Sequence, residues 1–163
     1  MYEQRFRTDI LPLKDKLFRL ALRITLDRSE AEDITQETLI RLWQHRDEWD
    51  QIQSLEAYAL TICRRLSLDH TKGERIEVRG DRNDMETLAP ADDRRPDEQL
   101  DQRQRVAIVH RLIDQLPETQ RTIMLLRDIE GYRYDEIAQA TGLTETQVKV
   151  YLHRARKKIR EQL

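Results

Sequence analysis

Apolar residues recur every three or four positions in the first part of the chain, which is the spacing of one helix face. This stripe contains Phe6, Ile10, Leu13, Leu17, Leu20, Ala21 and Ile24. Pro12 lies inside it. Because proline lacks an amide N–H, Pro12 either starts the main helix or kinks a longer one. The pattern predicts a helical segment over residues 6–24.

Two further helices are predicted before residue 73. The stretch "SEAE" begins the first of them, because Ser29 can cap its N-terminus and Glu32 can complete a capping box three residues later. This helix should end near His45. After a break at "WDQIQS", apolar residues return at helical spacing from Leu55 to Lys72. We therefore expect residues 1–72 to form one small helical domain.

The next stretch, "GERIEVRGDRNDMETLAPADDRRPDE", has two glycines, two prolines, many charges and few apolar residues. This composition is typical of a linker, so we expect a flexible linker over residues 73–97. Helical spacing resumes after it. Pro96 suits a first helical turn, and Pro117 begins another helix that reaches Arg127. The prediction is an all-α protein with a second helical domain over residues 98–163.

The composition agrees with helical domains and excludes several other classes. The 163 residues are 38% hydrophobic and 37% charged, and runs of β-branched residues are almost absent. The only cysteine, Cys63, excludes an internal disulfide, and its apolar neighbours favour a buried thiol over a reactive one. No apolar stretch approaches the ~18–20 residues that span a bilayer, and the N-terminus has no secretory signal. We expect a cytoplasmic protein without membrane insertion.

A helix-turn-helix is the strongest local pattern. Ala138 allows two helices to approach closely, Gly142 suits a left-handed turn, and Val148 can pin the second helix to the first. Thr144 is a good N-cap, and Gln147 completes a capping box with it. This pattern has two interpretations, a DNA-binding motif or a helical hairpin packed only for stability.

Charge favours DNA binding. Although the whole chain carries a net charge of −2, residues 145–163 contain six cations and two anions. Val148, Leu152, Ala155 and Ile159 form a buried stripe on this helix, so its cations must face solvent. A basic helix after a tight turn suits the major groove. Residues near its start should reach base edges, and later cations should contact phosphates. The base-edge candidates are Thr146, Gln147, Lys149, Val150 and His153, and the phosphate candidates are Arg154, Lys157 and Lys158.

The helix "SEAEDITQETLIRLWQH" has two apolar faces. Ala31, Ile34, Thr38 and Leu42 make one stripe, suited to the core of the domain. Leu39, Ile40 and Trp43 lie on another side, near the polar residues Asp33, Gln36 and Glu37. The second face either packs against another helix of the domain or is an exposed docking surface with an acidic rim.

The third helix, "SLEAYALTICRRLSLDHTK", combines basic residues with Tyr58. Arg64, Arg65, His70 and Lys72 supply positive charge. Basic residues near aromatic rings can hold single-stranded nucleic acid by backbone contact and base stacking. The alternative is that Tyr58 is a core residue and the cations are solvated, which is the commoner arrangement on a helix.

These segments, in this order, resemble a bacterial sigma factor of the ECF (extracytoplasmic-function) class in the sigma-70 family. "AEDITQETLIRLW" resembles the polymerase-docking helix of the family, and "SLEAYALTICRRLSLD" resembles its promoter-melting helix. Residues 112–160 resemble its final domain almost throughout. The stretches "LPLKDKLFRLALRIT" and "VKVYLHRARKK" are similar to the branch that is abundant in Bacteroidetes. Arg65 is a departure, because the family often has Asn there.

The resemblance implies a transcription initiation factor with no bond chemistry of its own. Its partners would be core RNA polymerase, through the clamp coiled coil of the largest subunit, promoter DNA, and an anti-sigma factor that holds it inactive. The implied polymerase-binding residues are Asp33, Gln36, Glu37, Leu39, Ile40 and Trp43. The implied residues for the −10 element are Tyr58, Arg64, Arg65, Asp69 and Lys72. The implied residues for the −35 element are Thr144, Thr146, Gln147, Lys149, Val150, His153, Arg154, Lys157 and Lys158.

Other functions explain less of the chain. A stand-alone helix-turn-helix regulator accounts for residues 132–163 only, and a helical interaction module leaves the basic helix without a role. The four histidines lack metal-ligand spacing, and neither a glycine-rich phosphate loop nor a nucleophile–histidine arrangement is present. We therefore expect no enzyme activity, no catalytic residues, no metal and no cofactor.

Overall fold

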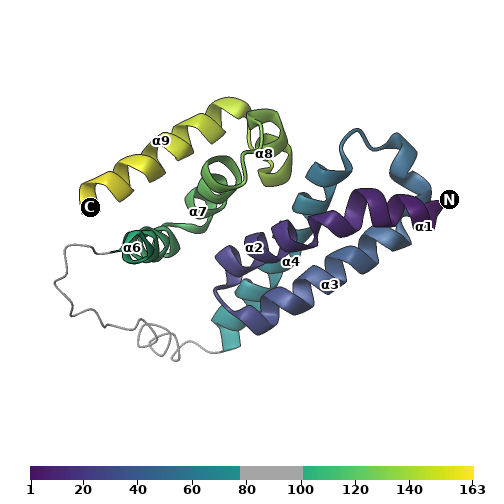
Figure 1. Cartoon of the computed structure of the whole chain (residues 1–163), viewed down its shortest axis with the longest axis horizontal. Coiled ribbons are helices and arrows are strands. Elements are labelled where there is room, and N and C mark those ends of the chain that lie inside the picture. Colours follow the sequence, from purple (N-terminus) through teal and green to yellow (C-terminus); the bar gives the residue numbers. More distant parts are fainter. Residues whose placement is uncertain (78–100) are drawn as a thin grey trace.

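The computed structural model describes residues 1–77 and 101–163, with the backbone alone for residues 73–77. Within these ranges every regular element is helical, which confirms the all-α fold class (Figure 1). The predicted linker lies outside the described residues from residue 78 onward. Among the helices that are described, none combines the length and the hydrophobicity needed to cross a bilayer.

The N-terminal part contains three main helices and several shorter turns. Helix α1 (Tyr2–Arg5) leads through a π-helical turn, η1 (Phe6–Ile10), and a 3-10 turn, η2 (Leu11–Leu13), into α2 (Lys14–Thr25). Helix α3 (Arg28–Gln44), the 3-10 helix η3 (Arg46–Gln51) and α4 (Leu55–Glu77) follow. Pro12 lies in the 3-10 turn directly before α2, so it interrupts the regular hydrogen-bond pattern without ending the helical path.

Two sequence expectations about helix ends were wrong. Asp27, not Ser29, caps α3: its backbone is extended, and its side chain accepts a hydrogen bond from the Glu30 amide. Ser29 already lies in the first helical turn. Helix α4 continues through Gly73 to Glu77 instead of ending at Lys72, because a single glycine costs a helix only about 1 kcal/mol.

The C-terminal part contains α6 (Gln102–Asp114), α7 (Glu118–Met124), the π-helical turn η4 (Leu125–Ile129), α8 (Tyr134–Thr141) and α9 (Glu145–Gln162). Pro117 precedes α7 as predicted, and the helical path continues past Arg127 to Ile129. The predicted first turn at Pro96 lies outside the described residues. In the described part, this domain begins with α6.

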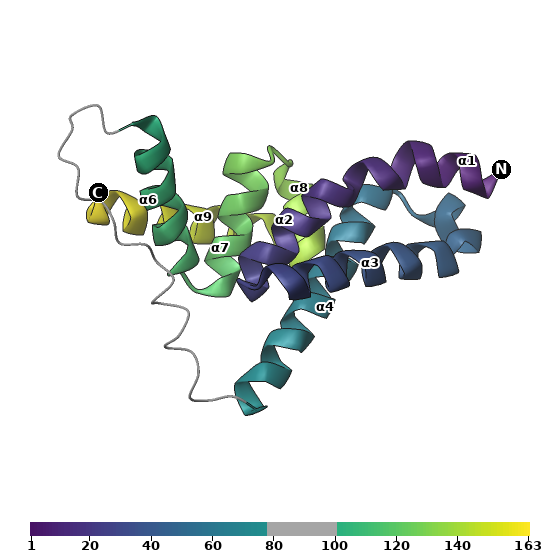
Figure 2. The same cartoon turned by 60° about the horizontal axis from the view of Figure 1, so that its bottom comes forward.

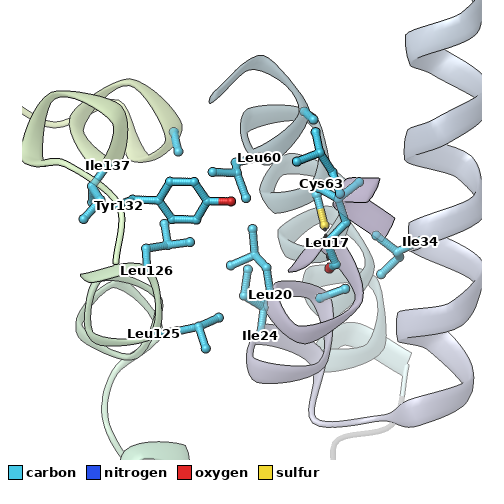
Figure 3. Packing of buried hydrophobic residues seen from close by; sticks show 14 of the residues in the cluster. Leu17, Leu20, Ile24, Ile34, Leu60, Cys63, Leu125, Leu126, Tyr132 and Ile137 are labelled. Carbon is cyan, nitrogen blue, oxygen red and sulfur yellow. Dashed lines mark hydrogen bonds between the residues drawn. The ribbon is translucent and has the colours of Figure 1, made fainter. Parts of the chain in front are cut away.

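The two helical parts pack against each other and share one hydrophobic core. Helices α2 and α4 lie in the middle, with α3 on one side and the C-terminal helices on the other (Figures 1 and 2). Figure 3 shows Tyr132 directed from the C-terminal part towards α2 and α4, with Leu60 beside it. A smaller cluster joins α6, α7 and α9 through Ile113, Leu116, Met124, Ala155 and Ile159. The sequence predicted two domains but did not predict this contact between them.

Candidate nucleic-acid and protein interfaces

Helices α8 and α9 form the predicted helix-turn-helix. Gly142 ends α8 with φ +75°, and its amide donates a 2.9 Å hydrogen bond to the Ala138 carbonyl. The Gln147 amide donates to Thr144 Oγ1 at 3.1 Å, and Thr144 N donates to Gln147 Oε1 at 3.0 Å. Val148 is fully buried. The turn, the capping box and the packing of the second helix are therefore confirmed.

Helix α9 has one buried stripe and one broad solvent face. Val148, Leu152, Ala155 and Ile159 are buried, as the sequence predicted. All nine residues predicted for the −35 element are exposed, and they are Thr144, Thr146, Gln147, Lys149, Val150, His153, Arg154, Lys157 and Lys158. The fold therefore brings these candidates together on one accessible helix.

The cations of α9 differ in how they are held. Arg156 forms a two-bond ion pair with Asp128, and this hydrogen bonding raises the pKa of Arg156. Within residues 1–77 and 101–163, Lys149, Arg154, Lys157 and Lys158 form no ion pair. These four cations are therefore free to contact phosphates, whereas Arg156 stabilises the domain.

Tyr134 supports the start of α9, a role that was not predicted from the sequence. The Lys149 ammonium lies 5.2 Å from the Tyr134 ring centre, and the Arg127 guanidinium lies 4.3 Å from the same ring. Such contacts favour particular positions of a cation over an aromatic face. The sequence signal is the aromatic and basic stretch "GYRY" at residues 131–134, which leads into the first residue of α8.

The second apolar face of α3 is partly open. Asp33 and Gln36 are exposed, Glu37 is half-buried, and the Ile40 side chain is 50% exposed. Leu39 and Trp43 are half-buried against the core. The other stripe, Ala31, Ile34, Thr38 and Leu42, is buried as predicted.

Trp43 is anchored by its neighbours, whereas Ile40 is not. The Trp43 ring packs edge-on against Phe6 and Trp49, at centroid distances of 5.6 and 6.3 Å. The Arg46 guanidinium lies 4.5 Å from the Trp43 ring centre. Ile40 is therefore the accessible apolar centre of this face, and Trp43 supports it from the side.

The candidates on α4 fall on two sides of the helix. Arg65, Asp69 and Lys72 are exposed, and at 100° per residue they share a side with the half-buried Tyr58. Arg64 faces the C-terminal part instead, where its guanidinium bonds Glu118 and the Thr141 carbonyl. The structure therefore separates Arg64 from the other four candidates.

Cys63 belongs to the core. Its thiol is buried and donates to the Leu17 carbonyl at 3.3 Å. Burial raises the pKa of the Cys63 thiol to about 12. The prediction of a buried thiol is confirmed. Because its raised pKa keeps the thiol neutral, Cys63 is also a poor nucleophile.

Two family models match the chain. The sigma-70 region 2 model matches residues 10–76, and the sigma-70 region 4 model matches residues 106–159. These segments cover all or most of α2, α3, α4, α6, α7, α8 and α9, whereas α1 precedes them.

Curated relatives and a solved structure agree with these matches. The ECF RNA polymerase sigma factor SigE of Mycolicibacterium smegmatis is 31% identical over 91% of this chain, which spans only 58% of that relative's length. The ECF RNA polymerase sigma factor SigL of Mycobacterium tuberculosis is 32% identical over 88% of this chain and 80% of its own length. The sigma factor RpoE of Bartonella quintana, solved in complex with the anti-sigma factor NepR, has a TM-score of 0.73 with 23% identity, over 96% of this chain and 94% of its own. This chain belongs to the ECF RNA polymerase sigma factors of the sigma-70 family.

Proposed function

We propose that this chain is a transcription initiation factor that binds core RNA polymerase and directs it to promoters with −10 and −35 elements. The observation that carries the proposal is the basic face of α9 together with its N-cap, Thr144. Every residue predicted for the −35 element is exposed there, and the turn that leads into α9 is held by a capping box. Membership of the ECF family supports the same conclusion. The chain acts by binding in the cytoplasm and makes or breaks no bond.

The −35 element is read by α9 in the major groove. Lys149 and Val150 are exposed near the start of the helix, where side chains reach base edges. The Gln147 side chain accepts a hydrogen bond from Thr144 N through its oxygen, which leaves its amide N–H groups to donate. Arg154, Lys157 and Lys158 lie further along and contact phosphates, which position the helix.

Core polymerase binds the open face of α3. Ile40 supplies the apolar centre, with Leu39 and Trp43 beside it and Asp33, Gln36 and Glu37 at the rim. A buried apolar centre with a polar rim is the usual anatomy of a protein interface. The partner surface is the clamp coiled coil of the largest polymerase subunit.

The −10 element is held by the exposed side of α4. Arg65 and Lys72 offer charge to the strand backbone, and Tyr58 lies on the same side for base stacking. Asp69 lies between these cations along the helix and accepts hydrogen bonds only. An anti-sigma factor is the remaining expected partner, by analogy with the complex that the Bartonella quintana RpoE forms with NepR.

In vitro transcription with purified core enzyme on fragmented genomic DNA tests this function. The expected result is a set of discrete transcripts that require both core enzyme and this chain, and their start sites yield the promoter elements. Tight, specific binding to duplex DNA without polymerase, together with no transcription, would instead identify a stand-alone helix-turn-helix regulator.

A further inference from the structure

Helix α6 leaves an apolar groove open on the C-terminal part. Ile113 is the one buried residue of this helix, whereas Val106 and Ile108 are 53% and 43% exposed. Where α6 meets η4 and α9, Val106, Met124 and Ile129 line an open groove of about 360 Å³. Ile129 is itself 47% exposed. A contiguous exposed apolar surface of this kind indicates a place where another molecule docks.

The edge of this groove is positively charged. Arg105 lines it and is exposed, and within residues 1–72 and 101–163 it forms no ion pair. Asp128 lines the groove as well, but its two hydrogen bonds with Arg156 compensate its charge. Helix α6 as a whole carries three arginines and one aspartate. The groove therefore suits a helix that has an apolar face and acidic edges.

The exposed side of α3 has this complementary character. Trp43 follows Leu39 by four positions and the exposed Ile40 by three, which is the spacing with which an amphipathic helix fills a groove. Asp33 and Glu37 lie at the edge of the same side. Helix α3 as a whole carries four acids and two arginines. The chain therefore contains both an apolar groove with a basic edge and an apolar helix face with an acidic edge.

The two surfaces lie on opposite sides of the molecule. Helix α6 packs on α7 and α9, whereas α3 packs on α2, α4 and η3. Both views show α2 and α4 between α3 and the C-terminal helices (Figures 1 and 2). In this arrangement α3 cannot enter the groove of its own chain, but the α3 of another copy can. Because the two surfaces differ, such a contact joins copies head to tail.

We propose that the groove between α6, η4 and α9 binds the α3 helix of a second copy of this chain. Ile40 of one copy packs beside Val106 of the next, and the acids of α3 face Arg105. One helix in one groove buries a small area, so the association is weak and depends on concentration. Each added copy leaves a free surface at either end, so further copies can join.

Self-association covers the α3 face, and this gives it a regulatory consequence. A copy whose α3 lies in a neighbouring groove cannot present Ile40 to core polymerase. Polymerase and the second copy therefore compete for the same face, and crowded copies form a reserve that polymerase draws on. This consequence rests on the proposed function, whereas the self-association does not.

Sedimentation velocity of the full chain, from low to high micromolar concentration, tests the contact. We expect the average mass of the parent to rise with concentration, and the masses of Ile40→Glu and Val106→Glu to stay at that of one chain. Ile108→Glu is the matched control, since Ile108 is exposed on the same helix but lies outside the groove. It should associate as the parent does. Circular dichroism checks that each variant keeps its helicity.

A mixture of the two defective variants tests the head-to-tail direction. Ile40→Glu keeps an intact groove and Val106→Glu keeps an intact α3, so an equal mixture should form a complex of two chains and nothing larger. Self-association of Val106→Glu alone would indicate a symmetric contact between two α3 faces, and it would overturn the proposal.

Arg105→Glu tests the basic edge of the groove. Because it places like charges together, it should weaken self-association by about tenfold or more. Arg7→Glu is the matched control, since Arg7 is exposed on η1, away from the groove. Equal association of the Arg105→Glu and Arg7→Glu variants would overturn the pairing of this edge with the acids of α3.

Other outcomes separate the self-association from the proposed function. A parent chain that sediments as one copy at every concentration would overturn the self-association. If Val106→Glu then bound core polymerase more weakly than Ile108→Glu, the occupant of the groove would be polymerase instead. Excess core enzyme should disperse the assemblies of the parent, and assemblies that persist while core enzyme binds would overturn the competition. No binding of core enzyme to the dispersed parent chain would overturn the proposed function and leave the self-association standing.

Discussion

Helices α3 and α9 are both amphipathic, yet their exposed sides differ in kind. The exposed side of α3 has an apolar centre at Ile40 and acids at its rim. The exposed side of α9 carries, around Val150, lysines and arginines that form no ion pair with any residue whose side chain the structure describes. An exposed apolar surface stabilises a complex when binding buries it and so removes it from water. Clustered cations stabilise a complex with nucleic acid by displacing counterions from its phosphates. The two surfaces should therefore respond differently to substitution and to salt.

The largest expected effect is on stability, at Trp43. Replacing Trp43 with Ala removes its edge contacts with Phe6 and Trp49, so the free energy of unfolding should fall by about 2–4 kcal/mol. Urea unfolding followed by circular dichroism measures it. An unchanged midpoint would mean that Trp43 is part of the docking surface only.

Ile40→Glu should separate docking from folding on the same helix. Because Ile40 is exposed, the substitution should leave the unfolding midpoint unchanged but weaken core polymerase binding by about 2 kcal/mol, roughly 30-fold. Affinity measured by fluorescence anisotropy checks this. Leu11→Glu is the matched control, since Leu11 is 41% exposed on a different element. Equal losses in both variants would remove α3 as the docking helix.

Lys149→Ala should change sequence choice on α9. Lys149 lies near the start of the helix over the Tyr134 ring, so its loss should relax one position of the −35 element by about 1–3 kcal/mol. Selection from promoters with randomised −35 elements, read by sequencing, measures the preference. The same preferred sequence in both proteins would assign Lys149 to phosphate contact.

Lys157→Ala should have the smallest effect. A phosphate contact weakens binding similarly for all sequences, so the preferred −35 element should stay the same. The slope of log affinity against log salt should become shallower by about 1. Binding to a −35 duplex at several salt concentrations checks this. An altered base preference would place Lys157 among the reading residues.

The helix-turn-helix was predictable in detail because its determinants are local. Gly142 takes a left-handed turn, Thr144 and Gln147 bond each other across three residues, and Val148 follows the helical period. Each of these features depends on neighbours within one or two turns of chain. The start of α3 was missed because serine and aspartate both cap well, and only the extended backbone at Asp27 selects between them.

The sequence by itself determined the helices, their buried stripes and the basic side of α9, since helical period and capping act over a few residues. Tertiary structure alone decided that Ile40 is exposed while Trp43 packs against Phe6. The Phe6 and Trp43 side chains meet although they are 37 positions apart in the chain. It alone paired Arg64 with Glu118, 54 positions apart. A local pattern states that a residue is charged or apolar, but its partner is set by how whole helices pack, and that packing depends on the entire chain.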